Sequence, residues 1–327
     1  MEVLAPRERL GPGGAAEWRE TPMDLNTLYH RTVEAWADRV NAVASDQWDG
    51  PTPCRGWTVR ELTNHVVGED LWTAPLVNGS TIAEVGDRFD GDLVGDDPAR
   101  AALDAAMEAT KAVADRLPDG GTVHLSYGEE QLSEYVHQLA ADHLVHGWDL
   151  AAATAGDTRL DPHLVAEVAA WFTPREEMYR GGGAIGPRGV SHGGAQGDLL
   201  AAFGRDAEWG PTHAALAGFS SAFGTGDVDA IMALMADDCV FEATGPAPDG
   251  VRHEGADAVR AVWVDLFEQT RDASFTEEES YAGGDRGVLR WRFDWVGDDG
   301  TPGHVRGADV LRFRDGKVCE KLSYVKG

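Results

Sequence analysis

The chain has 327 residues, which at about 150 residues per domain predicts two domains, each long enough to bury its own core. Aspartate and glutamate number 56 against 28 for lysine and arginine, and the net charge of −28 argues against binding to nucleic acid or to an anionic membrane surface. A hydrophobic fraction of 43% with 11 tryptophans is typical of a folded globular protein and excludes a disordered acidic chain.

The N-terminus and the cysteines bear on the cellular compartment. Residues 1–22 carry charges of both signs and lack the apolar stretch of about 7–15 residues that a secretory signal contains. We therefore expect a cytoplasmic protein in which residues 1–22 form a disordered extension. Cys54, Cys239 and Cys319 are odd in number and far apart, as expected of free thiols in a reducing compartment. The apolar stretch at 164–172 is shorter than the about 18 residues of a membrane-spanning helix, so no membrane partner is expected.

Residues 23 to about 174 have the pattern of helices. Apolar residues recur at steps of three and four, which is the period of an amphipathic helix. Thr58 and Glu61 match a capping box, in which two side chains satisfy free backbone amides at a helix start. The predicted helices cover residues 25–43, 58–69, 98–117 and 130–153. Four helices of this length predict an all-α bundle.

A different pattern follows a glycine-rich stretch. Residues 181–197 contain too many glycines for regular structure, and we place the domain boundary near Gly210 and Pro211. Residues 212–327 begin with two helical segments and continue with segments typical of strands. The predicted strands cover residues 239–243, 287–296, 305–314 and 317–325, with a hairpin turn at Asp315 and Gly316. Helices followed by strands predict an α+β domain.

Three side chains of the helical region are candidate metal ligands. Asp142 and His146 are four residues apart, so they lie on one side of the fourth predicted helix. His65 lies on the apolar face of the second helix, and a bundle can bring it to the same interior point. Two histidines and one carboxylate leave a coordination position open, as in catalytic zinc sites. The alternative is that these histidines are hydrogen-bonded core residues, since buried polar groups only need a partner.

Three sequence runs resemble a known family. They are PTPCRGWTVRELTNHV (51–66), ADHLVHGWDLAAATAG (141–156) and DLLAAFGRDAEW (198–209). Together they resemble the DinB-like metal-binding superfamily, in the branch that contains the mycothiol-dependent maleylpyruvate isomerase N-terminal domain. The resemblance covers residues 23–209 and implies a four-helix bundle that holds a divalent metal ion. Cys54, within the first run, is interpreted as a small buried residue because no base accompanies it locally.

The resemblance also implies a ligand set and a cofactor. His65, Asp142 and His146 match the metal ligands of the family, and Zn²⁺ is the expected ion. Asp142 stands where this branch has glutamate, and His143, nearer the centre of the apolar stripe, competes with it as the third ligand. Glu69 is either a carboxylate that orients His65 or a solvated helix residue. The implied cofactor besides the metal is mycothiol or another low-molecular-weight thiol.

Asp309 is the candidate catalytic residue of the second domain. Val305, Leu311 and Phe313 form the inward face of a predicted strand, and Asp309 falls on the same face. Burial in an apolar cavity raises the pKa of a carboxylate and suits it to general acid or base catalysis. The expected aromatic walls are Trp291, Phe293 and Trp295, together with Tyr324 and Trp263. The alternative is a buried acid that a backbone amide or an arginine holds in place.

Two runs of the second domain resemble another family. They are AFGTGDVDAIMALMADDCVFEATG (222–245) and VRGADVLRFRDGKVCEKLSYVKG (305–327). Both resemble the nuclear-transport-factor-2-like (NTF2-like) superfamily, close to SnoaL-like proteins, over about residues 212–327. The resemblance implies a cone-shaped α+β domain with a curved sheet around a pocket, a homodimer formed through this domain, and an acid/base role for Asp309.

The combined prediction is a two-domain protein that acts on a small molecule. We expect a metal-dependent enzyme of small-molecule thiol chemistry, either a mycothiol-type thiol transfer or a thiol-assisted isomerisation, whose second domain binds or converts the organic substrate. One alternative is a SnoaL-like cyclase, isomerase or dehydratase that uses Asp309, and another is a non-catalytic small-molecule-binding protein. Epoxide hydrolysis is not expected, because Arg292 and Asp294 match part of that pattern but Ser323 stands where it needs an aspartate.

Overall fold

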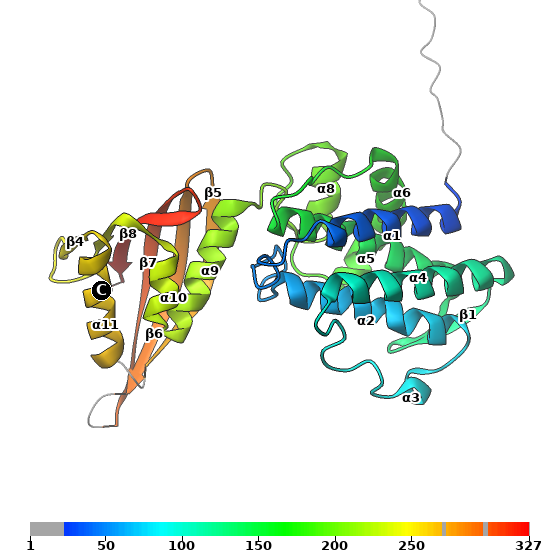
Figure 1. Cartoon of the computed structure of the whole chain (residues 1–327), viewed down its shortest axis with the longest axis horizontal. Coiled ribbons are helices and arrows are strands. Elements are labelled where there is room, and N and C mark those ends of the chain that lie inside the picture. Colours follow the sequence, from blue (N-terminus) through cyan, green and yellow to red (C-terminus); the bar gives the residue numbers. More distant parts are fainter. Residues whose placement is uncertain (1–22, 270–272, 297–299, 327) are drawn as a thin grey trace, which may run out of the picture.

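The computed structural model describes residues 23–269, 273–296 and 300–326, and it consists of a helical unit followed by an α+β unit (Figure 1). The extension predicted for residues 1–22 lies outside the described residues. The α+β unit begins with α9 (Pro211–Thr225), next to the expected boundary. Within the described part of the chain, every helix is too short or too polar to cross a membrane.

Four long helices form the bundle of the helical unit. They are α1 (Leu25–Asn41), α2 (Val59–Val77), α4 (Pro98–Arg116) and α5 (Leu132–Ala153). α1 packs on α5 and α2 packs on α4, and Figure 1 shows them side by side, so the predicted bundle is confirmed. The predicted capping box is present at the start of α2: the Thr58 hydroxyl accepts from the Glu61 amide, and the Glu61 carboxylate accepts from the Thr58 amide.

The α5 helix is the buried centre of the helical unit. Large apolar residues such as Leu144 and Trp148 are almost wholly inaccessible, and the helix is apolar on nearly all sides. A helix of this kind lies in the interior of a domain. Its polar residues His143, His146 and Asp149 are also buried, and buried polar groups need partners. The partners of these residues define the candidate site of this unit.

Shorter elements complete the helical unit. They are α3 (Ile82–Val85), a small sheet of β1 (Thr122–Leu125) and β2 (Gly128–Gln131), α6 (Pro162–Phe172), α7 (Glu176–Gly181) and α8 (Gly194–Ala202). The expectation that residues 181–197 lack regular structure is wrong at both ends of this stretch, which are helical. Leu199 and Leu200 of α8 are buried, so packing offsets the low helix propensity of the glycines before them.

The α+β unit is built on a six-stranded sheet in the order β4-β3-β8-β7-β6-β5. Its strands are β3 (Met235–Glu242), β4 (Arg252–Glu254), β5 (Ser274–Gly283), β6 (Arg286–Val296), β7 (Pro302–Arg314) and β8 (Lys317–Val325). The β3–β8 pair is parallel, and the other neighbouring strands are antiparallel. α9 packs on β5 and β6, α11 (Ala256–Gln269) packs on β3, and the short α10 (Val228–Ala233) lies between α9 and β3 in the sequence.

The four predicted strands are confirmed as β3, β6, β7 and β8, whereas β4 and β5 were not predicted. In β5 the consecutive acids Glu277, Glu278 and Glu279 coincide with a register shift, which breaks the alternation that marks a strand. The predicted hairpin turn between β7 and β8 is present, with positive φ at both Asp315 and Gly316, as a two-residue hairpin turn requires.

The two units have separate cores. The buried clusters of the helical unit lie within residues 28–202 and that of the α+β unit within residues 215–318. Arg55 and Glu277 form an ion pair of 2.8 Å between the units, but the arginine side chain is 69% exposed. Exposed pairs of this kind contribute about 0–1 kcal/mol. We therefore expect each unit to fold without the other.

A cut between Gly210 and Pro211 tests this expectation, because α9 starts at Pro211. Residues 23–210 and 211–327 should each give a cooperative thermal transition in calorimetry, and mixing the two fragments should not change their hydrogen-exchange protection. If either fragment is unfolded alone and folds when the other is added, the units depend on a shared surface and the expectation is wrong.

Candidate functional site

The bundle brings together the three side chains that the sequence predicts as metal ligands. His65 comes from α2, and Asp142 and His146 lie one turn apart on α5. His65 Nε2 is 3.7 Å from one carboxylate oxygen of Asp142, and His146 Nε2 is 3.3 Å from the other. One nitrogen or oxygen atom from each residue lies within 4.8 Å of the other two, so the three could bind one ion. That they do so stays a prediction.

The Asp142 carboxylate has the properties of a cation ligand. Its Oδ2 atom is buried and lacks a hydrogen-bond partner among the described residues. Burial opposes ionisation of Asp142, yet His146 and His65 outweigh it and lower the pKa of this carboxyl well below its usual range. His65 Nε2 lies 3.7 Å from Oδ2, beyond hydrogen-bonding distance, and a buried ionised oxygen without a hydrogen bond is costly unless a cation satisfies it. The shorter side chain of aspartate, compared with glutamate, still reaches the two imidazoles.

The second nitrogen of His146 is held by a buried carboxylate. His146 Nδ1 is 2.9 Å from Asp149 Oδ2, and the Arg205 guanidinium donates to the same oxygen at 2.7 Å. Burial opposes ionisation, but Arg205 and His146 lower the pKa of Asp149 to about 2. Burial likewise opposes protonation of His146, and Asp142 with Asp149 raises its pKa well above the usual value. Because Nδ1 is committed to Asp149, Nε2 is directed toward Asp142.

Cys54 lies on the Asp149 side of this histidine. Its Sγ atom donates to Asp149 Oδ2 at 3.2 Å, accepts from Arg205 at 3.0 Å and is 3.8 Å from His146 Nδ1. No base accompanies Cys54 locally in the sequence, but the fold brings His146 and Asp149 of α5 to it from 92 and 95 residues further along the chain. Burial raises the pKa of the Cys54 thiol, against the effects of His146 and Arg205.

Cys54, His146 and Asp149 form a second group whose atoms are close enough to share a metal ion. In this group, however, the Arg205 guanidinium already donates to both Cys54 and Asp149. The group thus contains its own cation and serves to orient His146. Arg205 was missed as a site residue, although it lies in the run DLLAAFGRDAEW that carries part of the family resemblance.

His143, the competitor of Asp142, points elsewhere. It is fully buried, with Nε2 3.1 Å from Asp70 Oδ1 and Nδ1 2.8 Å from the Leu139 carbonyl oxygen. The edge of its ring meets Tyr29 at a centroid distance of 5.8 Å. Burial opposes protonation, but Asp70 raises the pKa of His143. His143 is therefore a hydrogen-bonded core histidine, and Asp142 is favoured as the third ligand.

Two further residues border the three ligands. The Trp57 ring lies 5.0 Å from the His65 ring and 6.3 Å from the His146 ring, centroid to centroid, and is 38% exposed, so it forms one wall of the site. Glu69 is half-buried one turn after His65 on α2. Burial and the nearby Asp142 raise the pKa of Glu69.

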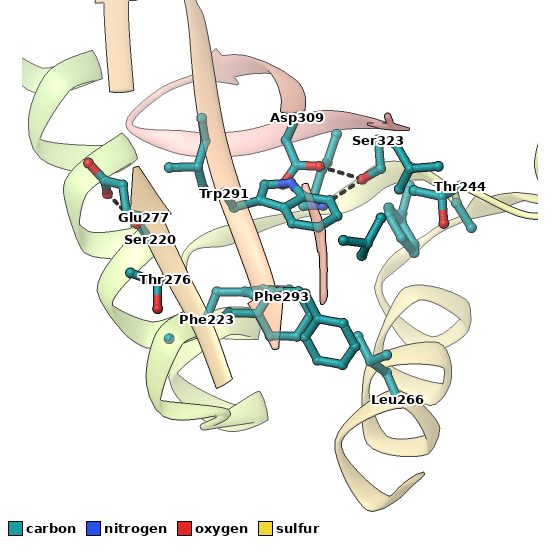
Figure 2. Close-up of a pocket in the computed structure, with 18 of the residues that line it drawn as sticks. Ser220, Phe223, Thr244, Leu266, Thr276, Glu277, Trp291, Phe293, Asp309 and Ser323 are labelled. Atoms are coloured by element: carbon teal, nitrogen blue, oxygen red, sulfur yellow. Dashed lines mark hydrogen bonds and ion pairs between the residues drawn. The ribbon is translucent and has the colours of Figure 1, made fainter. Parts of the chain in front are cut away.

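The α+β unit contains a cavity of about 550 Å³ between its sheet and its helices (Figure 2). Its aromatic lining residues are Phe223, Phe241, Phe275, Trp291, Phe293 and Trp295. This set includes the three residues of β6 that the sequence predicts as walls. The prediction is wrong for Trp263, which is wholly buried in the core of the unit, and for Tyr324, which is 54% exposed. A register shift at Arg312 and Phe313 reverses the inward set of β8, so Tyr324 faces outward.

Asp309 faces the cavity as predicted, and it is 3% exposed. Its carboxylate accepts from the Ser323 hydroxyl at 2.6 Å and pairs with the Lys321 ammonium at 2.9 Å. Figure 2 shows Asp309 and Ser323 joined at one side of the pocket. The alternative expected from the sequence was a buried acid held by a backbone amide or an arginine. The partner of Asp309 is instead a lysine. The same register shift that turns Tyr324 outward turns Lys321 inward.

Two glycines of β7 make room for the tryptophans of β6. Gly307 pairs with Trp291 and Gly303 with Trp295 across the two strands. A Cβ atom at Gly307 would lie 2.2 Å from the Trp291 ring, and one at Gly303 would lie 2.6 Å from the Trp295 ring. The rings therefore lie across the glycine backbone and form the wall of the cavity. Sequence reasoning missed this pairing, although two glycines four residues apart in one strand are a signal of it.

The other rim of the cavity carries one acidic side chain, which is paired with a cation. Glu277 hydrogen-bonds to Ser220 of α9 in Figure 2, and it also accepts from Arg55 of the helical unit at 2.8 Å. Arg292 and Asp294 alternate with the lining residues of β6, pair with each other at 2.7 Å and are absent from the lining.

Each of the two units matches a known protein family. Residues 29–151 match the family described as the mycothiol maleylpyruvate isomerase N-terminal domain, and residues 216–321 match the SnoaL-like domain. The chain belongs to the mycothiol maleylpyruvate isomerase N-terminal family and carries a SnoaL-like domain. It is 36% identical over 154 residues to an uncharacterized protein of Mycobacterium tuberculosis strain CDC 1551 and to one of strain H37Rv. The match covers 44% of this chain and 75% of each relative.

Solved structures similar to this chain include an NTF2-like protein of unknown function from Mesorhizobium loti. The two are 37% identical with a TM-score of 0.32, and the match covers 36% of this chain and 92% of that one. A putative polyketide cyclase from Sinorhizobium meliloti is 22% identical with a TM-score of 0.28, over 33% of this chain and 92% of that one.

The glycine and tryptophan pairs generate a stability prediction. Gly307→Ala should lower the free energy of unfolding by about 1–3 kcal/mol, because the added methyl group displaces a packed ring. Urea denaturation of the full chain measures this change. Gly283→Ala is the matched control, since an added Cβ there meets no atom within 4 Å, and it should change stability by less than about 0.5 kcal/mol. Equal stabilities of the two variants would show that Trp291 does not need Gly307.

Proposed function

We propose that the helical unit binds one divalent metal ion through His65, Asp142 and His146, and that the chain is a metal-dependent enzyme of small-molecule thiol chemistry. One observation carries the proposal: the ligand atoms of these residues lie within 4.8 Å of one another, around a buried Asp142 oxygen that lacks a hydrogen-bond partner among the described residues. Two nitrogens and one oxygen suit Zn²⁺ with a position left for a further ligand.

When bound, such an ion lowers the pKa of a thiol or water that joins it and so supplies a nucleophile at neutral pH. The residues of the chain orient and enclose the site. Asp149 holds Nδ1 of His146, Arg205 fixes Asp149, and Trp57 restricts access from one side. The family match supports mycothiol, or another low-molecular-weight thiol, as the thiol, and a thiol transfer or thiol-assisted isomerisation of a small electrophile as the reaction.

The α+β unit is proposed to bind or convert the organic substrate. The cavity with Asp309 in its wall also supports a second candidate function, a cyclase, isomerase or dehydratase in which Asp309 moves a proton. In that case the helical unit has a separate role. A non-catalytic small-molecule-binding protein is the third candidate, and it predicts ligand binding without turnover.

The ligand set predicts how metal content changes on substitution. The chain purified without chelator should hold about one divalent ion, and His65→Ala, Asp142→Ala and His146→Ala should each lose it, because two remaining ligands bind weakly. Elemental analysis measures the content. His143→Ala should keep the ion, and His137→Ala, an equivalent change on the outer part of α5, is the control for folding.

Titration of the metal-free protein with the metal ion tests the role of Asp149. Asp149→Asn should weaken metal affinity by about 10–100-fold without abolishing it, as expected of a carboxylate that orients a ligand. Full metal occupancy in the His65→Ala protein would contradict the ligand set. Loss of metal in His143→Ala but not in Asp142→Ala would make His143 the third ligand.

Thiol dependence can be measured with Co²⁺ in place of Zn²⁺ in a Cys54→Ser background. Mycothiol added to this protein should produce a thiolate-to-cobalt absorption band, because the three protein ligands leave one coordination position for the thiolate sulfur. The substitution ensures that any band comes from the added thiol. A band in the unmodified chain without thiol, absent from Cys54→Ser, would make Cys54 a ligand. The lack of a band after mycothiol addition would contradict the thiol proposal.

A further inference from the structure

The cavity of the α+β unit contains a buried ammonium group. Lys321 is 3% exposed, and it is one of only four lysines in the whole chain. Its Nζ atom lies 4.9 Å from the centroid of the Phe241 ring and 5.3 Å from that of Phe223. Lysine is rarely buried unless it is paired, so the charge of Lys321 requires a partner inside the cavity.

Lys321 and Asp309 neutralise each other inside the cavity. The ammonium and the carboxylate are 2.9 Å apart, and Ser323 hydrogen-bonds to both. An ammonium has three N–H groups; among the described residues Ser323 Oγ accepts from Nζ at 2.7 Å, and the Asp309 carboxylate faces the ammonium as an ion pair. At least one N–H therefore remains for an oxygen atom of a ligand. The carboxylate also retains lone pairs that can accept a hydrogen bond from a ligand hydroxyl.

The rest of the cavity adds no net charge to this pair. Glu277 at the opposite rim is held by Arg55 and Ser220, and the walls between the two polar ends are aromatic. A volume of about 550 Å³ lies within the range of small-molecule sites. An anionic ligand would meet Asp309, whose charge repels it, and a lysine whose charge is already compensated. A cationic ligand would be repelled by Lys321, and the Asp309 charge that could attract it is already compensated.

We propose that the Lys321–Asp309 pair makes the cavity selective for uncharged, flat, largely aromatic molecules that carry one carbonyl or hydroxyl oxygen, with Lys321 as the residue that recognises this oxygen. The inference rests on the proposed role of the α+β unit in binding the organic substrate, and it is independent of metal binding by the helical unit. Lys321 is thus a specificity-determining residue of the cavity, beside the acid/base candidate Asp309.

Two probes that share a naphthalene ring test the proposal by calorimetry at pH 7 with the full chain. 2-Naphthol carries an uncharged hydroxyl and 2-naphthoate an anionic carboxylate, so their affinities compare a neutral with a charged polar group on the same ring. The chain should bind 2-naphthol at least about tenfold more tightly than 2-naphthoate. Asp309→Asn leaves the Lys321 charge uncompensated and should raise the affinity for 2-naphthoate at least about tenfold, while that for 2-naphthol changes less than about threefold.

A double variant keeps the test informative if a single unpaired charge impairs folding. Asp309→Asn with Lys321→Met removes both charges; it should bind 2-naphthol about threefold to tenfold more weakly, through loss of one hydrogen bond, and should not gain affinity for 2-naphthoate. Lys317→Met, the same change at an exposed position of β8, is the control and should leave both affinities unchanged.

Three results would overturn the proposal. They are a wild-type preference for 2-naphthoate, equal changes of both affinities in Asp309→Asn, and no saturable binding of 2-naphthol by the wild-type chain. The measurements are repeated after removal of metal with a chelator and should not change. Failure of the helical unit to bind metal would therefore leave this result intact, so failure of one proposal can be distinguished from failure of the other.

Discussion

The ion pair between Asp149 and Arg205 holds the polar interior of the helical unit together. Asp149 is wholly buried on α5, and a carboxylate in that position is costly without a cation beside it. Arg205 supplies the cation from the segment after α8, and the paired carboxylate then fixes His146 and accepts from Cys54. The direction in which His146 presents its other nitrogen to His65 and Asp142 depends on this pair.

The same principle governs the second unit on a smaller scale. Asp309 is buried in an aromatic cavity, and Lys321 compensates it as Arg205 compensates Asp149. In a chain with a net charge of −28, most acids face water, where charge repulsion is weak and screened. Asp149 and Asp309 are different, since each lies buried at a candidate site with a dedicated cation, whereas a third buried acid, Asp70, pairs with His143 in the core. Internal charge compensation is therefore a property that the two candidate sites share.

Spacing along the chain predicted the features that depend on the pattern within a single helix or strand. Helix periodicity predicted that Asp142 and His146 share one side of a helix, and the family resemblance matched them and His65 to metal ligands. The structure brings the three together, and the capping box at Thr58 is a local pattern. Arg205 was not found, because its partner is 56 residues away and no periodicity connects them. Tyr324 of β8 was assigned to the cavity wrongly, because one bulge residue reverses the alternation of the strand and nothing in the local sequence marks it.

The position of β8 has a consequence for how the α+β unit forms. The last strand of the chain lies in the middle of the sheet, between β3 and β7, and it is the only link between the β4-β3 pair and the β7-β6-β5 meander among the described strands. During synthesis these two parts leave the ribosome with open edges, since the strand that joins them emerges last. Until then, Asp309 has no buried cation and the cavity has no closed wall. A chain that stops short of Lys317 would therefore expose two unpaired sheet edges, which are templates for aggregation.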